Sequence, residues 1–251
     1  MAERGLRHKK RLGQNFLTDD AIVGKILKLA EVKAQDQVIE VGPGIGTLTL
    51  ALRKTGATVC PVEVDPELAP LTHALNYDAL AIDSYRDELP QGEVKLVSNL
   101  PYNLGATILL SFFQELPQLK SATVMLQSEV VERIKASPGQ KNYGAYTVKL
   151  ALLSKVVGSF KVAPSCFSPP PHVLSTVVRL DRRDDLHLSA QSYSQACKLA
   201  EAAFAHRRKT IFNSMKTYFD DAAMAASALA ALKIDPSRRA ESIAPEGFVI
   251  S

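Results

Sequence analysis

Short apolar runs alternate with amphipathic stretches along roughly the first 180 residues of the chain. In the amphipathic stretches the apolar side chains recur at helical spacing: Ile22, Val23, Ile26 and Ala30 fall on one helical face. The pattern predicts strands at 38–41, 57–64, 94–98 and 122–126, and helices at 19–31, 47–54, 104–115, 128–136 and from Pro66 onward.

This alternation of strand and helix is typical of an α/β, doubly wound sheet with parallel strands. The β-branched run at 173–180 is expected to add a late strand to the same sheet. A charged linker follows at 181–185, and the chain beyond it is rich in Ala and other good helix formers. We therefore predict a catalytic domain over 1–182 and a small all-helical domain over 183–251, with helices at 190–205, 207–218 and 220–232.

A glycine loop follows the first predicted strand, with the sequence EVGPGIG at 40–46. Glycines let the backbone turn tightly and approach a ligand, and a helix N-terminus comes next. Glu63 ends the second predicted strand, where a carboxylate accepts hydrogen bonds from ribose hydroxyls. Dinucleotides and S-adenosylmethionine both fit this arrangement. The G-x-G-x-G spacing and the upstream carboxylate of Glu40, which would repel a pyrophosphate, favour the cationic S-adenosylmethionine.

The tetrad Asn99-Leu100-Pro101-Tyr102 follows the predicted strand at 94–98. Asn99 brings a carboxamide and the loop brings free carbonyls, while Pro101 stiffens the backbone. Tyr102 adds a flat ring beside these acceptors. Acceptors next to a stacking ring suit a planar base with an exocyclic amine, so the tetrad predicts a reaction at that amine.

The glycine loop, Glu63 and the Asn-Leu-Pro-Tyr tetrad together resemble the amino-methyltransferases that act on adenine. Three more segments, LGQNFL at 12–17, FSPPP at 167–171 and AHRRKT at 205–210, resemble the small-subunit ribosomal RNA adenine dimethyltransferases, the KsgA (RsmA) family. The resemblance runs in order from about Lys9 to the C-terminus. It implies a Rossmann-like class I methyltransferase fold with S-adenosyl-L-methionine as methyl donor. It also implies dimethylation of two adjacent adenines in a 3′-terminal hairpin loop of 16S rRNA, linked to 30S subunit biogenesis.

The resemblance further implies which residues bind the cofactor. Asn15 and Leu17 would close over it, Gly42 and Gly44 would contact it, with Gly42 at its methionine part, and Glu63 would bind its ribose.

An acid in an Asp-Ala-Leu segment, at the end of a third strand, would bind the adenine amine of the cofactor. Asp78 matches that wording, and Asp83, which has the better apolar run before it, is the rival. Between Asp65 and Asp78 there is barely room for a helix and a strand, which indicates a trimmed helix or missing residues.

The resemblance also implies roles toward the target base. Asn99 would contact both ligands, and its side chain and the Leu100 carbonyl would accept hydrogen bonds from the target amine. Tyr102 would stack on the flipped adenine and Phe167 would close its other face, with a plain core position as the alternative for Phe167. We count Asn99, Leu100, Pro101, Tyr102 and Phe167 as the catalytic set.

The net charge of +4 is modest, but the cations are clustered. Clustered cations bind phosphates more strongly than dispersed ones. We expect Lys9, Lys10 and Arg11 near the N-terminus, and Arg207, Arg208 and Lys209 on a predicted helix, to bind RNA. Solvated surface positions are the alternative for each of them.

The composition excludes several classes of protein. No apolar run approaches the length of a membrane span, and the first ten residues lack the apolar core of a secretion signal. The three cysteines form no metal spacing and no disulfide framework. We expect a cytoplasmic monomer without a metal, whose partner is the small-subunit rRNA within the 30S particle.

Three other functions are open at this point. An Erm-like enzyme would methylate 23S rRNA in the large subunit. A ribosome-assembly binding factor would use a methyltransferase scaffold without depending on its activity, although the intact tetrad and Glu63 argue against a dead enzyme. A DNA adenine methyltransferase is disfavoured because no DNA-recognition module is visible in the sequence.

Overall fold

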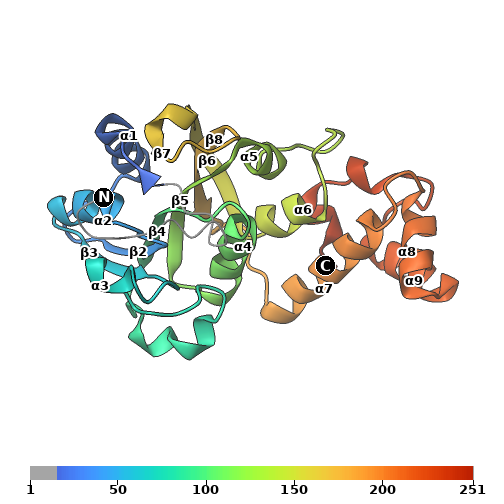
Figure 1. The fold of residues 1–251 in the computed structure, drawn as a ribbon. Helices are drawn as coiled ribbons and strands as arrows, with labels where there is room; N and C mark the ends of the chain where they lie inside the picture. Colours follow the sequence, from blue (N-terminus) through green and yellow to red (C-terminus); the bar gives the residue numbers. More distant parts are fainter. Residues whose placement is uncertain (1–15, 251) are drawn as a thin grey trace. The chain divides into compact units, whose positions relative to one another are not determined.

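The computed structural model describes residues 16–250, and these form two compact units. Unit 1 consists of the chain up to residue 128 together with 156–182, and unit 2 consists of 129–155 together with the chain from 183. Unit 1 is an α/β sheet structure, whereas the regular structure of unit 2 is almost entirely helical. Figure 1 shows the elements of both units.

A six-stranded sheet forms the centre of unit 1, in the order β3-β2-β4-β5-β8-β6. The strands are β2 (Gln37–Val41), β3 (Thr58–Val62), β4 (Val94–Asn99), β5 (Leu119–Gln127), β6 (Ser154–Val162) and β8 (Ser175–Arg182). β2 pairs in parallel with β3 and β4, and β4 pairs in parallel with β5. The doubly wound α/β class and the late strand predicted at 173–180 are confirmed.

The prediction that all strands run parallel is wrong for β8, which is antiparallel to β5. β8 lies next to β6 in the sheet, and the connection between them, 163–174, contains no α-helix. Parallel neighbours need a long crossover connection, usually helical, whereas antiparallel neighbours do not. The sheet is therefore mixed, with β8 antiparallel to β5.

Helices cover both faces of this sheet (Figure 1). α1 (Asp20–Ala30) and α2 (Thr47–Lys54) share a buried cluster with Val38, Val97, Met125 and Val177. Successive strand side chains point to opposite faces, so Leu126 points away from that cluster. α4 (Gly105–Glu115) packs on the second face, where a Cβ at Gly105 would lie 2.4 Å from Leu126 Cδ2.

The caps of α1 explain its limits. Asp19 is the N-cap residue, and its carboxylate accepts hydrogen bonds from the backbone N–H groups of Ala21 at 2.9 Å and Ile22 at 3.2 Å. Glu31 ends the helix in the left-handed conformation, with φ 49°. The predicted helix at 19–31 is thus confirmed to within one residue at each end.

The sheet edge beyond β3 is much less regular than the rest. The helix predicted from Pro66 is only α3 (Ala69–Thr72), and His73 ends it with φ 54°. No strand follows: Leu75 alone makes a parallel bridge with Val62. The chain then runs through single turns at Ile82–Ser84 and Arg86–Glu88. The short segment noted in the sequence is therefore a trimmed helix followed by a trimmed strand.

A second, two-stranded sheet joins distant parts of the chain in unit 1. β1 (Phe16–Leu17) pairs antiparallel with β7 (Phe167–Ser168), with Leu17 opposite Phe167. The next residue continues the connection, because the Thr18 N–H donates to the Cys166 carbonyl at 2.9 Å. Residue 17 is thereby fixed beside residue 167.

Unit 2 is built around one apolar cluster of its own. Its helices are α5 (Ser128–Ile134), whose first residue belongs to unit 1, α6 (Ala145–Ala151), α7 (Ala190–Phe204), α8 (Ile211–Phe219) and α9 (Ala222–Leu232). The three helices predicted after residue 190 are confirmed, although α8 begins four residues later than predicted.

The helical unit includes a segment from earlier in the chain. The chain divides at 182/183, where the sequence places a domain boundary, and 129–155 also belongs to unit 2. Tyr143, Val148 and Leu152 are buried in the same cluster as Leu199 and Phe248. The Tyr143 hydroxyl also donates to the Ile243 carbonyl at 2.7 Å. Burial of these apolar side chains attaches the segment to unit 2, although it lies between two strands of unit 1 in the sequence.

Residues 16–250 contain neither a candidate membrane span nor a candidate metal cluster. No helix there is both long and apolar enough to cross a bilayer. Within the same residues, no group of three or more His, Cys, Asp or Glu side chains is arranged to bind a metal.

Candidate functional site

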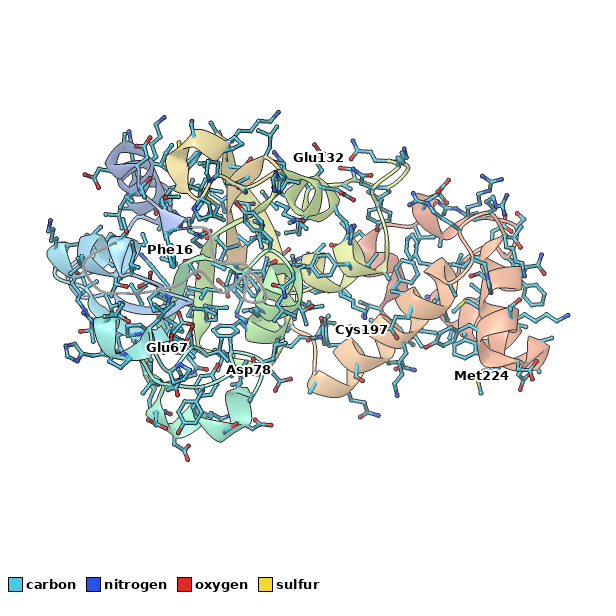
Figure 2. The ribbon with its side chains drawn as sticks, viewed as in Figure 1. Phe16, Glu67, Asp78, Glu132, Cys197 and Met224 are labelled. Carbon is cyan, nitrogen blue, oxygen red and sulfur yellow. The ribbon has the colours of Figure 1, made fainter. Side chains whose placement is uncertain are left out.

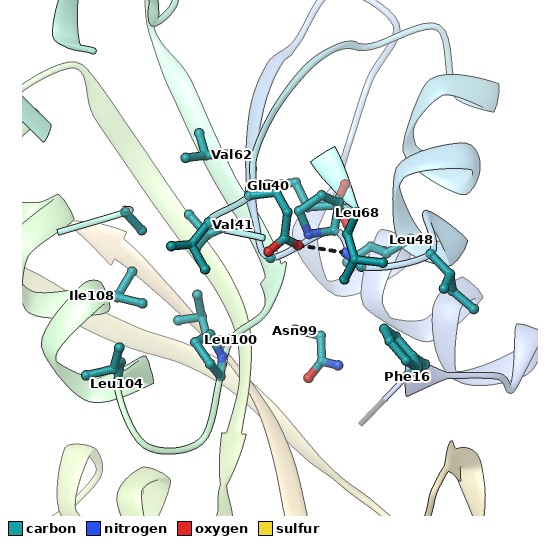
Figure 3. Close-up of a pocket in the computed structure, with 18 of the residues that line it drawn as sticks. Phe16, Glu40, Val41, Leu48, Val62, Leu68, Asn99, Leu100, Leu104 and Ile108 are labelled. Atoms are coloured by element: carbon teal, nitrogen blue, oxygen red, sulfur yellow. Dashed lines mark hydrogen bonds between the residues drawn. The ribbon is translucent and has the colours of Figure 1, made fainter. Parts of the chain in front are cut away.

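A pocket of about 130 Å³ lies in unit 1 where β2, β3 and β4 end (Figure 3). In a sheet of this type, ligands bind at the carboxyl ends of the parallel strands. The pocket wall contains every predicted site residue between Leu17 and Tyr102 apart from Asp83: Leu17, Gly42, Gly44, Glu63, Asp78, Asn99, Leu100, Pro101 and Tyr102.

The glycine loop forms one side of this pocket. Gly42, Gly44 and Gly46 have φ values of 67°, 57° and 89°, in the left-handed region that favours glycine. A Cβ at Gly44 would lie 2.8 Å from Phe16 Cε1, so the ring of Phe16 sits directly against the loop. Gly46 is the N-cap of α2, which directs that helix's N-terminus toward the loop. The backbone at Gly42, by contrast, is open to a ligand, because a Cβ there would meet no atom within 4 Å.

Glu63 follows β3 and is only 6% exposed. Its carboxylate accepts hydrogen bonds from the Gly44 N–H at 3.3 Å and from the Asp65 N–H at 3.0 Å. Burial raises the pKa of Glu63, and these two bonds oppose the rise. The structure therefore brings the glycine loop and Glu63 together, as their spacing in the sequence predicts.

Glu40 is the last-but-one residue of β2 and was not among the predicted binding residues. It lines the pocket, is 2% exposed, and its Oε2 has no hydrogen-bond partner within residues 16–250. Burial raises the pKa of Glu40 to about 8; the Thr49 hydroxyl and Arg53 oppose the rise, and nearby Glu63 adds to it. A buried ionised carboxylate without a partner is costly, so burial favours the protonated form of Glu40, and a cation bound in the pocket would favour the ionised form. Its place directly before the glycine loop was the signal in the sequence.

The Asn99–Tyr102 tetrad forms another part of the pocket wall. Asn99 ends β4, and the Leu100 N–H donates to the Met125 carbonyl at 3.2 Å. The Pro101 carbonyl accepts from the Gly105 N–H at 2.7 Å, which joins the tetrad to the start of α4. The Tyr102 hydroxyl lies 2.5 Å from Ser175 Oγ, and burial raises the pKa of the phenol. The tetrad is thus a fixed loop carrying a neutral aromatic ring.

Phe167 does not line the pocket. It is 3% exposed and packs in the buried cluster with Leu17 and Val97. This is the core position that the sequence left open as the alternative. Phe16, by contrast, was not predicted and does line the pocket (labelled in Figures 2 and 3).

The two acids proposed for the cofactor's adenine have different surroundings. Asp78 lines the pocket (labelled in Figure 2), and its Oδ1 accepts from the Leu80 N–H at 2.9 Å. Asp83 does not line the pocket; its side chain is 90% exposed and forms an ion pair with Arg86 at 2.8 Å. The geometry favours Asp78.

The predicted RNA-binding residues are described only in part. Lys9, Lys10, Arg11 and also Asn15 lie outside the described residues. Arg207, Arg208 and Lys209 are exposed, but they lie in a turn between α7 and α8 and not on a helix, as had been predicted. Thr210 caps α8 by accepting from the Asn213 N–H at 3.3 Å, so the helix begins only after the cations.

The residues that line the pocket fit S-adenosylmethionine. Glu40 offers a buried, unpartnered carboxylate oxygen to a cation, and Glu63 offers a carboxylate to ribose hydroxyls. Around Gly42, a Cβ would meet no atom within 4 Å, which leaves room for a ligand against the backbone. Asp78 supplies an acceptor for an adenine amine.

Comparison with known proteins identifies the family to which the chain belongs. A family model described as ribosomal RNA adenine dimethylase matches residues 5–249. The ribosomal RNA small subunit methyltransferase A of Mycobacterium bovis (strain BCG / Pasteur 1173P2) is 38% identical over 264 residues, which covers 98% of this chain and 83% of that protein. The protein of the same name from Clostridium botulinum (strain Loch Maree / Type A3) is 36% identical, over 96% of this chain and 92% of that one.

Solved structures show the same fold. A dimethyladenosine transferase from Plasmodium falciparum superposes with a TM-score of 0.77 at 24% identity, over 93% of this chain and 94% of that one. The 23S rRNA methyltransferase ErmE superposes with a TM-score of 0.66 at 25% identity, over 93% and 96%. The fold is therefore that of the class I methyltransferases, and the chain belongs to the ribosomal RNA adenine dimethylase family.

Proposed function

We propose that this enzyme transfers methyl groups from S-adenosylmethionine to the exocyclic amines of two adjacent adenines in a 3′-terminal hairpin loop of 16S rRNA. The observation that carries the proposal is the shared pocket. Asn99 and Tyr102 line the same cavity as the glycine loop and Glu63, so a target base and a methyl donor meet there. Membership of the family supports ribosomal RNA as the substrate.

The glycine-loop side holds the cofactor in this proposal. Glu63 accepts hydrogen bonds from its ribose, Gly42 and Gly44 contact it through their backbone, and Asp78 accepts from its adenine amine. Leu17 and Phe16 cover it from β1. When bound, S-adenosylmethionine supplies an electrophilic methyl group on a cationic sulfur. Glu40 lines the same pocket, and the positive charge of the bound cofactor would favour its ionised form.

The tetrad orients the target amine. The Asn99 side chain and the Leu100 carbonyl accept the two amine hydrogens, which favours a pyramidal nitrogen whose lone pair points to the methyl group. Tyr102 stacks on the flipped base, and its bond to Ser175 fixes the ring. No strong general base is required, because positioning supplies most of the rate.

The partner and setting follow from the same proposal. The rRNA is bound within the 30S particle, with Arg207, Arg208 and Lys209 on phosphates, together with the N-terminal cations Lys9, Lys10 and Arg11. We propose that the enzyme acts as a monomer in the cytoplasm during 30S subunit biogenesis. The two relatives described above that carry the name small subunit methyltransferase A are 38% and 36% identical over nearly the whole chain.

Labelled-methyl transfer to purified subunits tests the proposal. Small subunits lacking the modification are incubated with the enzyme and labelled S-adenosylmethionine, and the modified bases are mapped. We expect label on two adjacent adenines of 16S rRNA and none on large subunits. Label on 50S particles alone would establish the Erm-like activity instead. Tight binding to 30S particles without label on any adenine would indicate an assembly factor.

A further inference from the structure

Tyr77 occupies an unusual place in the irregular edge of unit 1. It lies two residues after Leu75, whose single bridge to Val62 replaces a full edge strand. Side chains, not a strand ladder, hold the loop that follows. Asn76 Nδ2 donates to the carbonyls of Glu63 at 2.8 Å and Val64 at 3.3 Å. The loop with Tyr77 is thereby tied to the backbone of the ribose-binding carboxylate.

The ring of Tyr77 is held from two directions. Its hydroxyl donates to Glu88 Oε1 at 2.7 Å. Its ring stacks on Tyr85, with centroids 5.2 Å apart and planes inclined by 19°. Tyr85 is itself 1% exposed, and its hydroxyl donates to the Ala79 carbonyl at 2.9 Å. A stacked pair backed by a buried ring is a rigid aromatic wall.

The aromatic wall borders the pocket next to Asp78, which directly follows Tyr77 in the sequence. Tyr77, Asp78 and Ala79 all line the cavity, and so does Val64, which is 51% exposed. An aromatic face, an exposed apolar side chain and a carboxylate acceptor surround the same space. Together they suit a flat, apolar-faced base with an amine at its edge.

We propose that Tyr77 stacks on the adenine of the cofactor, with Tyr85 behind it, and that this pair determines the specificity for an adenine nucleoside. The inference rests on the proposed cofactor, S-adenosylmethionine, and adds a residue to its binding site. The pair also replaces the missing edge strand as the support for Asp78. The stack then consists of three rings: Tyr85, Tyr77 and the adenine.

The absence of tryptophan from the chain offers a direct test. Tyr77→Trp places a single indole at the wall, and Tyr218→Trp places one on α8, where Tyr218 is 48% exposed. We expect titration with S-adenosylhomocysteine to quench the emission of the first variant to saturation and to leave the second unchanged. A Tyr77→Trp variant that binds the ligand by calorimetry without any change in emission would overturn the inference.

Calorimetry on three more variants measures the contribution of the ring. Tyr77→Ala is expected to weaken S-adenosylhomocysteine about tenfold or more, because base stacking contributes roughly 1–3 kcal/mol. Tyr77→Phe keeps the ring and loses only the bond to Glu88, so its Kd should stay within about threefold of the wild type. Tyr218→Ala is the matched control and should bind as the wild type does.

The outcomes separate this inference from the proposed function. If the wild type binds S-adenosylhomocysteine and Tyr77→Ala binds it within about twofold, Tyr77 does not stack on the base, while the proposed reaction stands. If the wild type does not bind the ligand at all, both are overturned. If Tyr77→Ala shows no thermal transition and is therefore unfolded, the quenching of the Tyr77→Trp emission by S-adenosylhomocysteine decides whether Tyr77 stacks on the base.

Discussion

The pocket has two unlike sides within one unit. The glycine-loop side, formed by residues 40–48 and Glu63, follows complete strands, and its carboxylates Glu40 and Glu63 are 2% and 6% exposed. The edge side, formed by 75–79, follows a single bridged residue, and Asp78 is exposed there. Asn99 lies on neither side, at the end of the strand β4.

The difference shows two ways to prepare a polar group for a ligand. On the glycine-loop side, burial controls the charge state, since it raises the pKa of both carboxylates. On the edge side, water surrounds the carboxylate, and hydrogen bonds of the loop fix its position instead. Substitutions on the first side should therefore change affinity through electrostatics and backbone geometry, and those on the second through the order of the loop.

The largest effect is expected from Asn99→Ala, which removes, at the end of β4, the group that contacts both the target base and the cofactor in the proposed mechanism. The rate of methyl transfer to 30S particles should fall about 100-fold or more, because misplacement of the amine alone costs that much. Binding to the particle should persist. Asn103→Ala is the control, since Asn103 is exposed nearby and does not line the pocket. Transfer by Asn99→Ala at the normal rate would refute the mechanism.

A smaller effect is expected from Gly44→Ala, which breaks the glycine-loop side. The new Cβ would lie 2.8 Å from Phe16 Cε1 at a φ of 57°, so loop and ring must move apart. We expect the Kd for S-adenosylhomocysteine to rise about tenfold, measured by calorimetry.

Gly139→Ala is the matched control for this substitution. Gly139 has φ 87°, but its Cβ would meet nothing within 4 Å, and it lies in unit 2. Both variants should lose stability through backbone strain of about 1–2 kcal/mol, seen as a lower Tm. If Gly139→Ala raised the Kd for S-adenosylhomocysteine as much as Gly44→Ala does, the effect of Gly44→Ala would come from lower global stability and not from the glycine loop.

On the edge side, Asp78→Asn should lower the affinity for S-adenosylhomocysteine only about fivefold. The reason is that a solvent-exposed charged contact contributes roughly 1 kcal/mol or less. Asp83→Asn should leave the Kd unchanged, since Asp83 faces solvent and Arg86. The same titration measures both. The reverse result would assign the adenine amine to Asp83 and remove the edge side from the cofactor site.

Of all these substitutions, Glu40→Gln at pH 6 is expected to have the smallest effect on the Tm, because Glu40 is already neutral at that pH. Its pKa is about 8 in the folded chain against an ordinary value of 4.5, so between these values the folded chain holds a proton that the unfolded chain has released. Raising the pH through this window therefore lowers the free energy of unfolding.

Thermal unfolding measured at pH 6 and pH 9 checks this dependence. The Tm of the wild type should fall more over this interval than the Tm of Glu40→Gln. Asp78→Asn should follow the wild type. Parallel pH dependence of the wild type and Glu40→Gln would mean that the carboxylate is ionised throughout.

The glycine-loop side could be predicted from sequence because its signals are local. The apolar run at 38–41, the glycines after it and Glu63 at the end of the next run each report on their own neighbours in the chain. Their meeting follows from the parallel pairing of adjacent strands. The tetrad was predictable for the same reason, since it directly follows β4.

The remaining features depend on partners distant in sequence. Nothing within 129–155 indicates that Tyr143 and Leu152 pack with residues after 183, and the direction of β8 depends on which strand it joins. Phe167 is buried and Phe16, to which the sequence assigned no role, lines the pocket; β1 and β7, which carry the two rings, are paired although they lie far apart in the sequence. Tyr77 was missed because its role depends on Tyr85 and Glu88.

The pairing of β1 with β7 also determines when, during translation, this site can be completed. Phe16 and Leu17 leave the ribosome about 150 residues before Phe167 and Ser168. Until then the wall of the pocket at Leu17 has no strand to pair with. The nascent chain therefore cannot complete its cofactor pocket before most of the sequence has been translated, and the closing contact is one of long range.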